Sequence, residues 1–332
     1  MFDFSSSPLL TLRTPGERTF RLFALLLIHW GIAFIVPVVV GVIPGTIASL
    51  ILGLNGFMKL FGDAMSQGLS GGSGTLDSEA IRALSESISA TKGYRIAELF
   101  GSAWSIAVAI FFCLAIQRRS LATIGLEKRD AAKRYGIGFL FGAVLCSLVI
   151  LLSCLSRAST FVGFNSDVDV LFLFFILIGY VIQGAAEELL IHGLFMTALF
   201  RNVRWLPAVL ISALLFSVLH AANAGVTVLS ILNVFLFGVF LGLYVIRTGS
   251  VVGATAIHAA WNFAEGQIFG CPVSGFASFS GLFTVTSDAS RSVTNGGAFG
   301  PEGGLAATMV LMLALIAVIF LPPFRKKDQP EP

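Results

Sequence analysis

Long apolar runs separated by short polar linkers dominate the chain. Residues 22–58 and 205–246 contain no Asp, Glu, Lys or Arg over 37 and 42 positions. About 20 apolar residues cross the hydrocarbon core of a bilayer as a helix, so each run is long enough for one or two crossings. The pattern predicts eight membrane spans, at about 22–43, 96–116, 135–155, 170–200, 206–221, 226–246, 250–269 and 305–323.

Two of the predicted spans have features that bear on their packing. A helix over residues 170–200 would extend about 46 Å at 1.5 Å per residue, which exceeds the roughly 30 Å core. We therefore expect strong tilt, a break or a protruding end in this helix. Gly138 and Gly142 in the span 135–155 are four residues apart, a spacing that lets another helix approach closely.

Composition and charge agree with a multi-pass protein of the plasma or inner membrane. Hydrophobic residues make up 56% of the chain and charged residues 12%, against about 25% charged in soluble domains. With eight spans, the linkers rich in Lys and Arg all lie on one side of the membrane, and the positive-inside rule makes that side cytoplasmic. These linkers are residues 1–21, 117–134, 201–205, 247–249 and 324–332. We predict an all-α transmembrane helix bundle with both termini cytoplasmic, surrounded by lipid and without a nucleic-acid partner.

The chain divides into three predicted parts. Residues 1–134 hold spans 1 and 2, an extracytoplasmic loop and a basic cytoplasmic linker. That loop contains a flexible Gly/Ser tract at 68–74 and a candidate amphipathic helix at 77–90. Residues 135–269 form the helix core that carries the candidate chemistry. Residues 270–332 form a Gly/Ser/Thr-rich extracytoplasmic loop followed by span 8.

Ionisable residues inside the apolar runs are the candidate functional groups. A charged side chain at the bilayer centre costs about 2.5–3.5 kcal/mol on insertion scales, so such residues persist mainly where they face a protein interior or a water-filled cavity. The adjacent pair Glu187 and Glu188 lies in span 4, and His192 follows Glu188 at helical i,i+4 spacing. His29 stands alone in span 1, which is typical of a hydrogen-bond donor in helix packing.

Two further spans repeat this spacing of polar residues. Phe216 and His220 are one helical turn apart, as are His258 and Asn262, and Glu265 continues the latter stripe. A carboxylate beside imidazoles can activate water as a general base, while His and Asn can donate hydrogen bonds to an oxyanion. Glu and His can also bind a divalent metal such as zinc, although the H-E-x-x-H pattern is absent. A polar packing network and a proton-coupled transporter are the alternatives to a catalytic site.

These motifs resemble those of the CAAX protease and bacteriocin-processing (CPBP) family, which includes the type II CAAX prenyl endopeptidase. That family carries Glu-Glu-x-x-x-Arg, Phe-x-x-x-His and His-x-x-x-Asn or Asp on successive membrane helices. This chain has the three pieces in the same order, from Glu187 to Asn262. One position differs, because His192 stands where the family has Arg.

The resemblance implies an intramembrane endopeptidase that acts on a peptide or protein substrate, which is lipidated in part of the family. Glu187 would activate water together with His220, and His258 with Asn262 would stabilise the oxyanion. Glu188 would support the site, with His192 and Phe216 beside it. If a metal is bound, its ligands would be Glu187, His220 and His258. The alternative within the same fold is a non-proteolytic scaffold or immunity protein.

Overall fold

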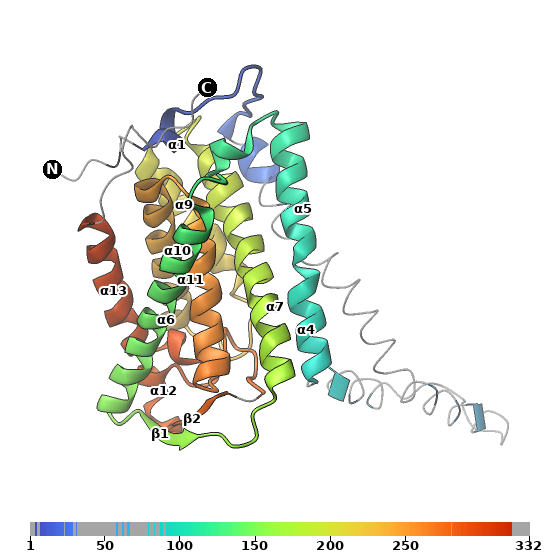
Figure 1. Cartoon of the computed structure of the whole chain (residues 1–332), viewed down its shortest axis with the longest axis vertical. Coiled ribbons are helices and arrows are strands. Elements are labelled where there is room, and N and C mark those ends of the chain that lie inside the picture. The colour runs from blue at the N-terminus through green and yellow to red at the C-terminus, as the bar shows by residue number, and fades with distance from the viewer. Residues whose placement is uncertain are drawn as a thin grey trace.

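The structure, a computed structural model, describes residues 4, 7–22, 24–28, 31, 58, 62, 65, 66, 79, 83, 87, 88, 91–279 and 281–320. The predicted first span, His29, the Gly/Ser tract at 68–74 and the amphipathic helix at 77–90 lie wholly or largely outside these residues. The described chain folds mostly into helices that run along one axis, with a small sheet at one end (Figure 1).

Helices are present at each of the other predicted spans. They are α4 (Lys92–Gly101), α5 (Ala103–Phe111) and the π-helical η1 (Phe112–Ile116); α6 (Ala131–Leu155); α7 (Val170–Glu188), the π-helical η3 (Leu189–Phe195) and α8 (Met196–Leu199); α9 (Trp205–Leu219); α10 (Val228–Thr248); α11 (Val251–Phe263) and the π-helical η4 (Ala264–Ile268); and α13 (Leu305–Phe320).

Four of these helical stretches are long and apolar enough to cross a membrane: Lys92–Ile116, Ala131–Leu155, Val170–Leu199 and Val228–Thr248. Trp205–Leu219 and Leu305–Phe320 are shorter apolar helices. The mostly helical architecture of a membrane protein is therefore confirmed. The number of spans, the sidedness of the termini and the division into three parts stay predictions.

A two-stranded sheet was not predicted. Strand β1 (Ser159–Phe164) pairs antiparallel with β2 (Phe283–Ser287), with Ser159 opposite Ser287 and a bulge between Phe161 and Gly163. Since the two strands are far apart in sequence, no local pattern could announce the pairing. The short elements η5 (Ala289–Arg291), α12 (Ser292–Asn295) and η6 (Pro301–Gly303) follow β2, within the predicted loop. We call this the sheet end of the bundle.

Side-chain caps fix where the helices begin at the sheet end. Asp169 caps α7 by accepting a hydrogen bond from the Phe172 amide at 2.9 Å, and Thr91 caps α4 in the same way. The Lys92 ammonium also lies 2.8 Å from the Asp169 carboxylate, so one acidic residue holds the starts of α4 and α7 together. These contacts place the first turn of α4 beside α7.

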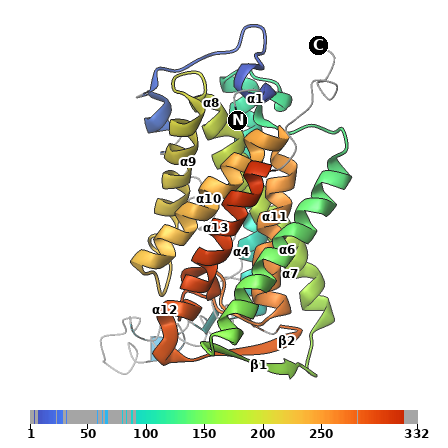
Figure 2. The ribbon, with the colours of Figure 1, turned by 90° about the vertical axis from the view of Figure 1, so that its left-hand side faces the viewer.

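Helix α11 is the centre of the bundle. All its residues from Val251 to Asn262 are buried, because α6 and α7 pack along it. Small residues allow this close approach: a Cβ atom added to Gly142 of α6 would lie 2.8 Å from the Ile257 Cα atom, and one added to Gly184 of α7 would lie 3.0 Å from the Ala259 nitrogen. The predicted role of the Gly138–Gly142 spacing is thereby confirmed. Figure 2 shows α13 against α10 and α6 on the outer side.

The long helical stretch Val170–Leu199 changes its winding in the middle. Regular α-helix ends at Glu188 and the π-helical η3 continues from Leu189 to Phe195, with all seven of its residues buried. π-helical turns are rare and occur frequently at functional sites. The expected break in this helix is therefore a change of helix type directly after the two glutamates.

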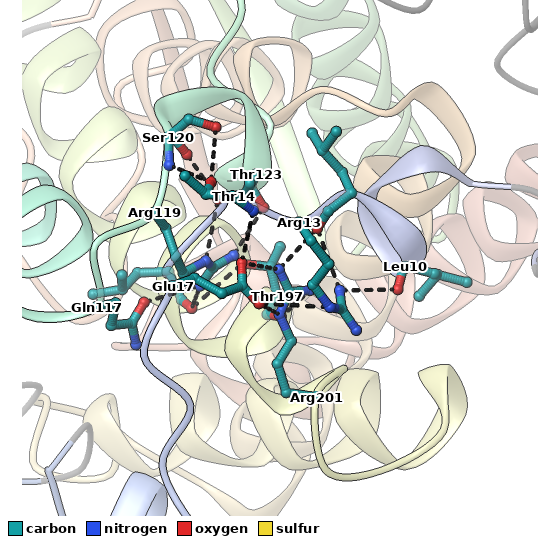
Figure 3. A network of polar contacts seen from close by, with 12 residues as sticks. Leu10, Arg13, Thr14, Glu17, Gln117, Arg119, Ser120, Thr123, Thr197 and Arg201 are labelled. Carbon is teal, nitrogen blue, oxygen red and sulfur yellow. Dashed lines mark hydrogen bonds and ion pairs between the residues drawn. The ribbon is translucent and has the colours of Figure 1, made fainter. Parts of the chain in front are cut away.

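A polar network closes the opposite end of the bundle, formed by α1 (Pro8–Thr11), η2 (Leu121–Ile124) and α8; we call it the α1 end (Figure 3). Arg119, 3% exposed, donates to Gln117 Oε1 at 3.0 Å, to the Thr123 hydroxyl at 3.1 Å and to the Thr197 hydroxyl at 2.5 Å. Burial and the charge of Arg201 lower the pKa of Arg119 to about 10, so it remains a cation at neutral pH. The guanidinium thus fastens the linker before α6 to α8.

Glu17 attaches the N-terminal segment to the same network. Its carboxylate accepts hydrogen bonds from the Thr14 amide at 3.1 Å and from Arg201 Nε at 3.1 Å. Burial opposes ionisation of Glu17, but the Thr14 hydrogen bond and the Arg201 charge outweigh it, and the pKa of Glu17 is lowered. The N-terminal segment is therefore held by charge as well as by packing.

Candidate active site

The two adjacent glutamates at the end of α7 point into different surroundings. The Glu188 side chain is 0% exposed, whereas that of Glu187 is 30% exposed and lines a cavity. Neighbouring residues on an α-helix are turned by about 100° from each other, which accounts for the difference. Only Glu187 therefore faces a space that a substrate can enter.

Glu188 joins two helices through a pair of imidazoles. Its Oε2 atom lies 2.5 Å from Nδ1 of His192, and its Oε1 atom lies 2.9 Å from Nδ1 of His258 on α11. A buried carboxylate is costly unless hydrogen-bonded, and here both oxygens have a partner. Because a carboxylate accepts, both Nδ1 atoms carry the proton, and the Nε2 atom of His258 is left to face the site.

His220 enters the site from the C-terminal cap of α9. Its Nδ1 atom donates to the Phe216 carbonyl oxygen at 2.8 Å, so its Nε2 atom also faces the site. The Phe216 ring, 2% exposed, lies 4.8 Å from the His220 ring and 5.9 Å from the His258 ring, measured between centroids. Phe216 thus keeps the two imidazoles apart and fixes their orientation.

The three predicted groups converge on one atom. Oε2 of Glu187 lies 3.9 Å from Nε2 of His220 and 3.9 Å from Nε2 of His258. This oxygen is buried and has no hydrogen-bond partner among the described residues. A buried acceptor without a partner is unusual in proteins, and it marks a place where a bound polar group would be favoured.

Asn262 is linked to Glu187 through Gln183, a residue for which the sequence predicted no role. Its Nδ2 atom donates to Gln183 Oε1 at 3.1 Å, and Gln183 Nε2 donates to Glu187 Oε1 at 2.9 Å. Gln183 precedes Glu187 by four residues, which was the signal available in the sequence. The chain of amides fixes the second oxygen of Glu187 and leaves Oε2 turned toward the imidazoles.

A cavity of about 310 Å³ opens onto Glu187 and His220. Its walls are mainly apolar, and its polar lining includes Arg95 and Glu98 of α4, which lie 2.7 Å apart as an ion pair. A second cavity, of about 20 Å³, is bounded by Phe216, His220, His258 and Asn262 among others. The small one has the volume that about one water molecule needs. The sequence predicted a helix here but no site residue on it, since Arg95 and Glu98 fit no motif.

Glu187, His220 and His258 are the predicted ligands if a metal is bound. In the part of the chain that the structure describes, no group of three His, Cys, Asp or Glu side chains is arranged to hold a metal ion. Glu265, which continues the His258–Asn262 stripe, is turned toward η6 and accepts a hydrogen bond from the Glu302 amide at 3.0 Å.

Comparison with known proteins gives one match. The family model described as type II CAAX prenyl endopeptidase Rce1-like matches residues 169–264, from the cap of α7 to the first residue of η4. This segment contains all the residues named above except those of α4, Glu265 and Glu302. No curated protein and no solved structure matches the chain significantly.

Proposed function

We propose that the protein is a membrane-embedded endopeptidase, because residues 169–264 match the family model of the type II CAAX prenyl endopeptidases. The observation that carries the proposal is the position of Glu187 Oε2 between the Nε2 atoms of His220 and His258, 3.9 Å from each, at a cavity. A water molecule held there would contact one carboxylate and two imidazoles.

In the proposed reaction Glu187 acts as the general base. It takes a proton from water while the water oxygen attacks the carbon of the scissile carbonyl, which gives a tetrahedral intermediate with an oxyanion. His258, and Asn262 beside it, stabilise that oxyanion by hydrogen bonds. The C–N bond then breaks, and the proton held on Glu187 passes to the leaving amine, directly or through His220 Nε2.

Glu188 and His192 would act through His258. The carboxylate fixes the His258 ring through its Nδ1–H group, and a His258 imidazole that also carries a proton on Nε2 donates from there to an oxyanion. His192 fills the second hydrogen-bonding place on Glu188, the place where the family's Arg would pair with the carboxylate. This contact supports the view that His192 replaces the family's Arg in function.

The test is the substitution Glu187→Gln, with Glu127→Gln as the matched control. Loss of a general base lowers turnover by about 10²–10⁴-fold, so E187Q should lose cleavage of a quenched-fluorescent peptide pool in detergent while keeping its unfolding midpoint. E127Q makes the same change in the linker before α6 and should retain cleavage. Full activity of E187Q would reject the mechanism. No cleavage by the unsubstituted chain would favour a non-proteolytic scaffold or a transporter.

A further inference from the structure

Charged residues divide unequally between the two ends of the bundle. The α1 end carries most of the Lys and Arg of the described chain: Arg13, Arg18, Arg21, Arg118, Arg119, Lys128, Arg129, Lys133, Arg134, Arg201, Arg204 and Arg247. The sheet end carries Lys92, Arg95, Arg157 and Arg291 together with the acidic residues Glu98, Asp167, Asp169, Asp288 and Glu302. By the positive-inside rule the α1 end faces the cytoplasm and the sheet end faces away from it.

The large cavity lies toward the sheet end. Its lining includes Arg95 and Glu98 from the first turns of α4, Asn223 from the turn after α9, and Ser274 and Phe276 from the loop that leads to β2. These segments are joined to each other: Asn223 Nδ2 donates to the Ser274 carbonyl at 2.9 Å, and the Arg95 guanidinium lies 4.3 Å from the Phe276 ring centroid. No residue of the linkers at the α1 end lines this cavity.

Packing closes the path between the site and the α1 end. Every residue of η3 and α8 is buried, and Glu188 and His192 are both 0% exposed. Beyond them, Arg119 holds Thr197 of α8 to the linker before α6 (Figure 3). Glu187 is thus reached through the large cavity and not from the α1 end.

We infer that the catalytic cavity opens to the non-cytoplasmic side of the membrane, and that the substrate is a peptide segment presented there. The statement that the bound peptide is a substrate rests on the proposed function. The side of the membrane to which the cavity opens is inferred from charge and packing alone. The apolar walls suit a segment that has left the bilayer, and Arg95 with Glu98 gives the mouth polar groups of both signs. A prenylated C-terminus in the cytoplasm would meet the closed end.

Single cysteines test the sidedness without any need for activity. Glu98→Cys places a thiol in the cavity and Ala222→Cys one at the exposed turn beside it, while Lys128→Cys places one at the α1 end. A membrane-impermeant maleimide added to intact cells should label the first two, and should label Lys128→Cys only after permeabilisation. The unsubstituted chain is the blank, since Cys113, Cys146 and Cys271 are buried and Cys154 half-buried. Labelling of Lys128→Cys alone in intact cells would overturn the inference.

Cleavage in oriented membranes tests the substrate class. A membrane-impermeant fluorogenic peptide pool should be cleaved by right-side-out vesicles at least about tenfold faster than by inverted ones. The membrane keeps the peptides away from the cavity of inverted vesicles, and the residual rate comes from vesicles of the other orientation in the same preparation. Cleavage confined to inverted vesicles would overturn the inference and keep the proposed function. Absence of cleavage in both, and in detergent, would overturn the proposed function, and the labelling pattern would then decide the sidedness by itself.

Discussion

Adding one methyl group to Gly142 of α6 should push this helix away from α11, which carries His258 and Asn262. The Cβ atom of G142A would lie 2.8 Å from both the Cα and the carbonyl carbon of Ile257, and closer still to the carbonyl oxygen. Non-bonded carbon atoms prefer about 3.5–4.0 Å, so α6 and α11 must move apart by about 0.7–1.2 Å. Overpacking of this kind costs about 1–3 kcal/mol.

The same shift should reach the chemistry because Ile257 directly precedes His258. If α11 moves by about 1 Å, the 2.9 Å contact between His258 and Glu188 is lost as a hydrogen bond. A misplacement of about 1 Å at a catalytic group can cost about 10²-fold in rate. We therefore expect G142A to be both less stable and about 10²-fold slower in peptide cleavage.

Gly136→Ala is the matched control on the same helix. A Cβ atom at Gly136 would meet nothing within 4 Å, so this substitution should be neutral or stabilise by about 0.4–1 kcal/mol through the unfolded chain. The measurement is reversible unfolding in mixed micelles for both variants, followed by cleavage rates. If G142A matches G136A in the free energy of unfolding, the close packing of α6 on α11 is not what the structure indicates.

Three further substitutions test the remaining contacts. His192→Ala removes one of the two hydrogen-bond partners of Glu188, and should lower the unfolding free energy by about 3–5 kcal/mol; adding Glu188→Gln should recover part of the loss, whereas simple additivity would contradict the pairing. Arg119→Lys leaves buried acceptors unpaired and should lower the free energy of unfolding by about 3 kcal/mol or more. Arg118 is exposed, so Arg118→Lys should change the free energy of unfolding little. The lowered pKa of Glu17 stabilises the fold at pH values above its usual pKa of about 4.3, and this stabilisation is lost as the pH falls through the lowered value. The advantage of the unsubstituted chain over Glu17→Gln should therefore decrease as the pH falls below about 4.3. An advantage of the same size at pH 3 and pH 7 would contradict that account.

Local spacing in the sequence was enough for the helices and for the pairs along each of them. Outside the undescribed first span, apolar runs placed the helices to within a few residues, because burial in lipid demands unbroken apolar helix. The four-residue spacing put His192 beside Glu188 and Phe216 beside His220, since residues one turn apart share a face whatever the helix packs against. Gly142 likewise announced a close contact, though not its partner.

Only the tertiary structure decided how these faces are turned toward each other. The spacing of residues does not say which of Glu187 and Glu188 faces open space, yet one lies in the cavity and the other is sealed between two imidazoles. That difference depends on the rotation of α7 about its own axis, which is set by the contact of Gly184 with α11 and by the change to π-helix at Leu189. The place of α4 beside the site depends likewise on Lys92 and Asp169, 77 residues apart. Such contacts join distant segments, so no window of sequence contains them, and the shared site exists only once the helices have packed.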